Sequence, residues 1–269
     1  AYNNESGNFT GNETLNDVYF NDSINIKDIL FLRGGTRISS SSIWGTVATP
    51  SVSGALVVPT PGLKTAYTKV RSSYGHAINN PTPYQLFVND SWTSPNPNLK
   101  PEHLDGWDIG FTQSFLGERI LMDGAYFRND YYNYIGYVSD PLTWVGQYQN
   151  TTSAHTDGFE GSLKFNVIRN LKTSLNYTYT NAKDDSTNLD LPGVPKNRWN
   201  YVVSYTPIER INLFITGIKA SNRVYSGENR VDGFFVTNIG TNIRLCSYKY
   251  ASLYLTAQLK NITNDKYEV

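Results

Sequence analysis

Apolar and polar residues alternate along residues 158–180. Phe159, Leu163 and Phe165 share one phase of this alternation, and polar residues occupy the other phase. A strand with this pattern has one apolar and one polar face. After a short turn at residues 167–170 the alternation resumes in the same phase. The stretch is therefore predicted to form an antiparallel hairpin with one apolar face.

The same period recurs along the chain and predicts about eleven strands in all. Besides the hairpin, these strands cover residues 28–38, 50–58, 64–75, 107–117, 120–130, 199–205, 211–217, 235–243 and 253–259. Asp123 interrupts the odd positions of one strand, and a lipid-facing Asp would be penalised, so Met122 and Tyr126 are placed on the apolar face. Residues 1–24 are rich in Asn, Gly, Ser and Thr and are expected to form a loop.

The predicted connections between strands are of two kinds, which alternate. Short ones lie near residues 60, 117, 168, 208 and 248, and longer ones lie near residues 40, 90, 187 and 226. Short turns at one end and long loops at the other are typical of outer-membrane barrels. A soluble β-sandwich would show the same alternation of faces, but tyrosines at strand ends and polar lumen-type residues favour the barrel. We therefore predict an all-β protein whose antiparallel strands form part of a transmembrane β-barrel.

Composition and charge argue against several other classes of protein. Lys+Arg and Asp+Glu are balanced at 23 each in a chain of 269 residues, so the charge gives no reason to expect a nucleic-acid partner. No apolar run is long enough for a transmembrane helix. The single cysteine, Cys246, rules out an internal disulfide.

Catalytic and metal-binding groups have little support in the sequence. Three histidines lack metal-ligand spacing: His76, His103 and His155. Three aspartates lack the loop pattern and the glycine of a calcium site: Asp184, Asp185 and Asp190. A triad of Ser153, His155 and Asp157 would rest on closeness in sequence, whereas triads are recognised by geometry. We therefore expect no enzyme activity, no metal site and no cofactor.

Several short segments resemble those of one family. The first segment along the chain is Arg71-Ser72-Ser73-Tyr74-Gly75, followed by Asn80-Pro81-Thr82-Pro83-Tyr84-Gln85-Leu86-Phe87. The second is Asn96-Pro97-Asn98-Leu99-Lys100-Pro101-Glu102, followed by Trp107-Asp108-Ile109-Gly110-Phe111. Three more segments follow downstream: Ala125-Tyr126-Phe127-Arg128-Asn129-Asp130, Gly158-Phe159-Glu160 and Lys260-Asn261-Ile262-Thr263-Asn264-Asp265-Lys266-Tyr267-Glu268. In this order, the segments are similar to those of TonB-dependent outer-membrane receptors.

The resemblance implies a barrel of about 22 strands filled by an N-terminal plug. Such a receptor imports a scarce solute, a small molecule or metal chelate such as a ferric siderophore or cobalamin, with energy from the inner-membrane TonB complex. It lies among the lipids of the outer membrane of a Gram-negative bacterium. Residues 1–269 would form the C-terminal portion of the barrel, with the plug and the final strand not present. A plug-free surface binding or adhesion protein, built as a barrel or a β-sandwich, is the alternative.

Aromatic residues at or above the predicted external rim are the candidates for ligand binding. They are Tyr84, Phe87, Trp92, Tyr132, Tyr134, Trp144 and Tyr148. Aromatic rings are also favoured at a membrane interface, and the sequence does not separate these two roles.

Four cations are predicted to face the lumen of the barrel. They are Arg33, Arg37, Lys69 and Arg71. In a whole receptor they would pair with carboxylates of the plug or line the path of an anionic ligand. Unpaired charges in a water-filled lumen are the alternative.

Overall fold

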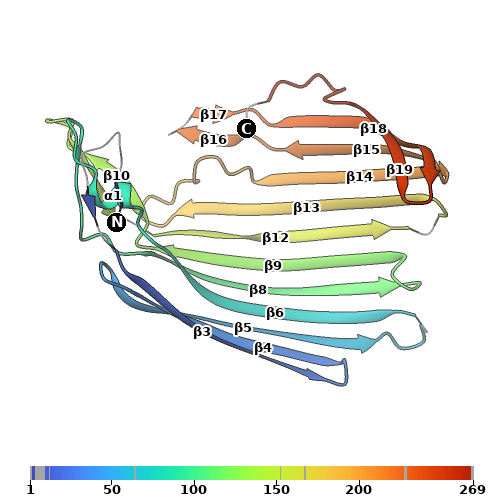
Figure 1. Cartoon of the computed structure of the whole chain (residues 1–269), viewed down its shortest axis with the longest axis horizontal. Helices are drawn as coiled ribbons and strands as arrows, with labels where there is room; N and C mark the ends of the chain where they lie inside the picture. The colour runs from blue at the N-terminus through green and yellow to red at the C-terminus, as the bar shows by residue number, and fades with distance from the viewer. Residues whose placement is uncertain are drawn as a thin grey trace.

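Within the described residues, twelve long strands form one antiparallel sheet that curves into part of a barrel in this computed structural model (Figure 1). The structure describes residues 2–3, 10–11, 13–63, 65–151, 153–166, 168–226 and 229–267. Successive long strands are neighbours, so the sheet is a meander with edges at β3 (Leu15–Ile26) and β19 (Ala251–Leu259). One continuous sheet excludes the two facing sheets of a β-sandwich.

Between these edges lie ten further long strands. They are β4 (Leu30–Ser41), β5 (Gly45–Pro59), β6 (Tyr67–Asn79), β8 (Glu102–Phe115), β9 (Ile120–Tyr132), β12 (Ala154–Phe165), β13 (Leu171–Asp184), β14 (Asn197–Ile208), β15 (Ile211–Ala220) and β18 (Phe234–Tyr248). The shorter elements are α1 (Pro83–Phe87), β1 (Tyr2–Asn3), β2 (Thr10–Gly11), β7 (Thr93–Ser94), β10 (Ile135–Ser139), β11 (Gly146–Asn150), β16 (Arg223–Ser226) and β17 (Asn229–Val231). No helix in the described part of the chain is long and apolar enough to cross a membrane.

The expectation of a loop over residues 1–24 is wrong for its second half, because β3 begins at Leu15. Val18 and Phe20 alternate there with polar residues, and β3 pairs with β4 along its whole length. Asn and Asp usually mark turns, but in a barrel wall their side chains can face a wet lumen while the strand ladder satisfies the backbone. Residues 1, 4–9 and 12 lie outside the described part. The sheet therefore has twelve strands, where the sequence predicted about eleven.

The connections alternate as predicted with one exception. β4 ends at Ser41 and β5 begins at Gly45, so the connection near residue 40 is short. The other short turns lie at one end of the sheet, and the longer segments with α1, β10 and β16 lie at the opposite end (Figure 1). Lys64, Val167 and Glu268, which belong to a predicted strand, a turn and a motif, lie outside the described residues.

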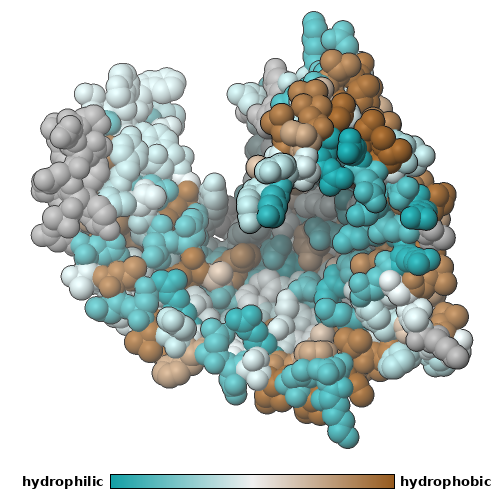
Figure 2. Space-filling model, turned by 45° about the vertical axis from the view of Figure 1, so that its right-hand side comes forward, coloured by the Kyte–Doolittle hydropathy of each residue, from teal (hydrophilic) through white to brown (hydrophobic). Residues whose placement is uncertain are grey.

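Cross-strand partners share a face of the sheet, and the predicted faces are confirmed. Leu163 pairs with Leu175, which pairs with Tyr201, in a row of apolar residues on the convex side. The space-filling view shows a hollow between two walls, with hydrophobic side chains gathered along the outer contour (Figure 2). Asp123 is a partner of Thr112, so it belongs to the opposite, polar face and Met122 faces outward.

After β19 the chain folds back along the loop end of β18. The amide of Ile262 donates to the carbonyl of Thr237, and the carboxylate of Asp265 accepts the amide of Phe235 at 2.7 Å. The ring of Tyr267 stacks on that of Phe234, with 5.0 Å between centroids. Because the pairing of β18 with β19 stops at Ile239, this segment satisfies backbone groups of β18 that β19 does not reach.

A charge scan tests the outward face. Leu163→Arg should lower the free energy of unfolding in lipid by about 2–4 kcal/mol, because it places a cation among acyl chains. Ser162→Arg, one residue away on the polar face and beside Asp123, should cost little. The measurement is urea-dependent folding of the receptor into lipid vesicles, and equal penalties at the two positions would contradict the assignment of faces.

Candidate functional site

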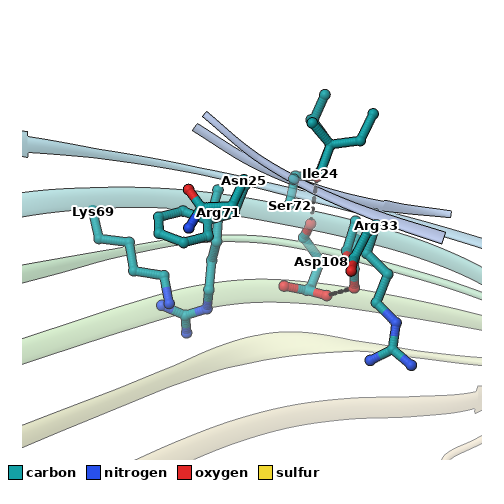
Figure 3. A pocket seen from close by; sticks show the side chains of 14 residues that line it. Ile24, Asn25, Arg33, Lys69, Arg71, Ser72 and Asp108 are labelled. Atoms are coloured by element: carbon teal, nitrogen blue, oxygen red, sulfur yellow. Dashed lines mark hydrogen bonds between the residues drawn. The ribbon is translucent and has the colours of Figure 1, made fainter. Parts of the chain in front are cut away.

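The concave wall carries a charged cavity of about 540 Å³ over β3, β4, β5, β6 and β8. Lys69 and Arg71 reach into it from β6, and Arg33 reaches into it from β4 (Figure 3). Ile24 of β3 points to the opposite side of the sheet in the same view. The alternation of the strands therefore gathers three of the four predicted lumen cations at one place on the inner wall.

Arg71 is held by a two-pronged ion pair with Asp123 of β9. Its Nη1 and Nη2 atoms lie 2.8 and 2.9 Å from the two carboxylate oxygens, and the hydroxyl of Thr112 donates to the same carboxylate at 2.6 Å. The arginine crosses β8 to reach its partner. Gly110 permits this crossing, because a Cβ at that position would lie 2.9 Å from Cζ of Arg71.

The four lumen cations differ in how their charges are balanced. Arg37 forms a two-pronged ion pair with Asp17 of β3, at 3.0 and 2.6 Å. Within the described part of the chain, Arg33 and Lys69 make no ion pair within 4 Å. Lys69 still acts on Asp123 through its longer-range charge. Arg33 and Lys69 are therefore the cations of this wall with charge available to an anion in the lumen.

A second candidate surface is the ordered cluster of loops at the end of the sheet that carries the longer connections. Its small core consists of Leu86 from α1, Leu99 and Ile135, each less than 7% exposed. Thr82 caps α1 by accepting the amide of Gln85, whose side-chain oxygen accepts the amide of Thr82 in return. β10 and β11 form a hairpin, and β7 adds a parallel strand beside β11. The loops are thus a folded unit with a core of its own.

The structure separates the predicted ligand-binding aromatics into supporting and exposed residues. Phe87 and Tyr148 pack against the loop core, and burial raises the pKa of the Tyr148 hydroxyl. Tyr84 meets the ring of Tyr148 edge to face at 6.2 Å and is itself exposed. Trp92 is 66% exposed, and Trp144 is 70% exposed at the tip of the β10–β11 hairpin. Within the loop cluster, Tyr84, Trp92 and Trp144 are therefore the predicted aromatics that are exposed to a ligand.

Tyr132 and Tyr134 are also exposed, but they belong to other surfaces. Tyr132 is the cross-strand partner of His103 on the outward face of β8 and β9. Tyr134 lines a separate cavity of about 510 Å³ at the external rim, together with Tyr131. Three apolar residues that were not predicted from the sequence complete this cavity: Leu191, Pro192 and Val194. They lie in a polar loop without periodicity, so no pattern indicated them.

The three aspartates considered as calcium ligands have different partners. The carboxylate of Asp184 accepts hydrogen bonds within its own turn, from Ser186 and Thr187. Asp185 contacts His155, and Asp190 forms an ion pair with Lys196 at 2.9 Å. The described residues contain no cluster of three or more His, Cys, Asp or Glu side chains that fits a metal ion.

A curved meander of strands with an apolar outer face and a polar inner wall defines the chain as part of a membrane β-barrel. The chain belongs to the family described as TonB dependent receptor-like, beta-barrel, whose sequence model matches residues 1–264. The resemblance noted in the sequence is thereby confirmed.

The chain is similar to several siderophore and ferric enterobactin receptors. The chain is 25% identical to the ferric enterobactin receptor PirA of Pseudomonas aeruginosa, in an alignment that covers 74% of this chain and 29% of that protein. Its fold is similar to that of the siderophore receptor PirA from Acinetobacter baumannii, with a TM-score of 0.76 at 18% identity over 94% of this chain and 42% of the other. The fold is also similar to that of a variant of the ferric enterobactin receptor PfeA from Pseudomonas aeruginosa in complex with enterobactin. The TM-score is 0.78 at 20% identity, over 93% of this chain and 40% of the other. The chain thus spans less than half the length of these relatives.

The Arg71–Asp123 pair yields a prediction about stability. Asp123→Ala should lower the free energy of unfolding by about 1–2 kcal/mol, because it leaves a partly buried arginine without its partner. The effect is smaller than for a fully buried pair, since the two side chains are 29% and 30% exposed. A double-mutant cycle with Arg71→Ala, followed by urea titration, measures the coupling between the two residues. Equal costs of Asp123→Ala with and without Arg71 would show that the pair contributes nothing.

Proposed function

We propose that the chain is part of an outer-membrane receptor that imports a ferric siderophore in a TonB-dependent manner in a Gram-negative bacterium. Membership of the receptor family supports TonB-dependent import, with the TonB complex acting through a plug domain. The named relatives are siderophore and ferric enterobactin receptors, which favours a ferric siderophore over cobalamin as the substrate. Lipid of the outer membrane covers the apolar outward face.

The observation that carries this proposal is the placement of aromatic loops above a polar, cation-bearing inner wall. Trp92 and Tyr84 lie on the folded loop unit, while Arg33 and Lys69 lie on the wall of the hollow. Aromatic side chains offer a large contact area at a small entropic cost, and a cleft of one charge sign raises the local concentration of a counter-charged solute. A chelate would therefore bind at the loops first and pass the cations later.

Uptake of iron by whole cells tests the proposal. Iron-starved cells with the intact receptor gene should accumulate radiolabelled ferric enterobactin or another ferric siderophore, and cells without the gene should lose that uptake. Restoring the gene should restore it. Loss of cobalamin uptake alone, with ferric siderophore uptake unchanged, would overturn the siderophore assignment and favour cobalamin.

Binding at the loops gives a prediction for two aromatic residues. Tyr84→Ala and Trp92→Ala should each weaken binding of the ferric siderophore by about 1–3 kcal/mol, in the range of truncated aromatic anchors. Trp107→Ala is the matched control, because Trp107 is also exposed but belongs to the outward face beside Tyr126. Binding titrations on the purified receptor check this. Wild-type affinity in both loop variants would assign Tyr84 and Trp92 to the membrane interface.

Passage through the barrel gives a prediction for the cations. Arg33→Gln and Lys69→Gln should slow uptake of an anionic ferric chelate by about tenfold or more, because they remove attraction from the wall of the lumen. Affinity at the external loops should stay unchanged. Arg37→Gln is the control and should have a smaller effect, since Asp17 already balances that charge. Uptake rates that are equal in all three variants and the wild type would contradict a role for these charges in transport.

A further inference from the structure

Two of the three histidines meet on the outward face of the barrel at its external end. His76 lies on β6 and is the cross-strand partner of Asp105 on β8. His103 lies on β8, two residues before Asp105 and therefore on the same face. Just below them on this face are Tyr74 and Trp107, which are cross-strand partners. The histidines thus lie immediately beyond aromatic residues of the kind that mark a membrane interface, on the side of the external water.

The two rings meet through their nitrogen atoms. Nε2 of His76 lies 3.2 Å from Nδ1 of His103, while Nδ1 of His76 lies 2.9 Å from a carboxylate oxygen of Asp105. One neutral arrangement satisfies both contacts: His103 donates its Nδ1–H to His76, and His76 donates its own Nδ1–H to Asp105. A single proton then occupies the space between two ring nitrogens that each can carry a lone pair.

The spacing of these nitrogens matches that of two ligands on one metal ion. With Zn–N bonds of about 2.0–2.1 Å, two ligands at the tetrahedral angle lie about 3.3–3.4 Å apart, whereas ligands at a right angle lie about 2.8–3.0 Å apart. The observed 3.2 Å is closer to the tetrahedral value. His103 would bind an ion through Nδ1 as its other neutral tautomer, with its proton moved to Nε2. The lone pairs of His76 Nε2 and His103 Nδ1 would then be directed at one ion between the rings.

The residues behind His76 form the supporting contacts that histidine ligands of metals commonly have. Such a histidine usually donates its other ring N–H to a carboxylate, which fixes the ring and raises its basicity. Asp105 provides this carboxylate, and the hydroxyl of Tyr74 donates to the same oxygen of Asp105 at 2.8 Å. Asp105 and Tyr74, on two paired strands, therefore hold the His76 ring in place before any ion arrives.

We propose that His76 and His103 form a surface site for a zinc-like divalent ion, with Asp105 as a positioning residue for His76. Imidazole nitrogen is a ligand that suits zinc and its neighbours among the transition metals. Within the described part of the chain, no group of three His, Cys, Asp or Glu side chains is placed to hold one metal ion. The protein therefore supplies two ligands, and water completes the coordination. The site is separate from the loops and the inner wall and does not depend on the proposed transport.

Metal titration of the purified full-length receptor, after treatment with a chelator, tests this site. The probes are Zn²⁺ alone in calorimetry and Co²⁺ alone in visible spectroscopy, which reports tetrahedral coordination. One ion should bind per chain in the wild type. Binding should be lost in His76→Ala and in His103→Ala, and Asp105→Asn should weaken it by about tenfold or more. His103→Gln roughly preserves the side-chain volume and should also lose metal binding. A difference in gel migration between its unheated and boiled samples verifies that the barrel of this variant has folded.

His155→Ala is the matched control, because His155 lies on the same outward face two strands further along the sheet but contacts Asp185 instead of a second histidine. It should leave metal binding unchanged. The proposal would be overturned by the absence of saturable binding, by binding that survives the loss of His76 or His103, or by binding that disappears with His155.

Discussion

The structure depends on one constraint, which is that a strand in a bilayer must satisfy its backbone hydrogen bonds by pairing with other strands. Each of the ten strands from β4 to β18 in the large sheet is paired on both sides. This pairing fixes the register, and the register places cross-strand partners on the same face. One phase of every strand therefore faces lipid, and the other forms the wall on which Arg33, Lys69 and Arg71 gather. The apolar outer face and the cation-bearing inner wall are both consequences of this ladder.

The two-residue alternation of apolar and polar positions predicted most strands and both faces of the sheet, because contact with lipid selects apolar residues at every second position. It failed for β3, where Asn and Asp resemble a loop when composition is considered alone. Partners across the sheet could not be predicted either. Arg71 reaches Asp123 across an intervening strand, and His76 meets His103 only because β6 and β8 pair in one particular register. The spacing of these residues along the chain contains no information about that register.

The loops were predicted only as a long, aromatic segment, since their order has no periodic signal. Their core joins Leu86 and Leu99 to Ile135, from three separate parts of the sequence. This core explains why aromatic residues that look alike in the sequence differ in burial. Phe87 and Tyr148 support the unit from within, whereas exposed rings such as Trp92 are held on a preformed base. A surface that is already ordered loses less conformational freedom when it binds a ligand.

The segment after β19 has a consequence for assembly. An exposed strand edge is a template for pairing with another chain, and such pairing leads to aggregation. Asp265 and Ile262 form hydrogen bonds with backbone groups at the loop end of β18. The ring of Tyr267 lies against that of Phe234 at the same end. The loop end of β18 is therefore closed to strands of neighbouring copies. A strand added on this side of the described sheet would therefore pair with β19 and not with the loop end of β18.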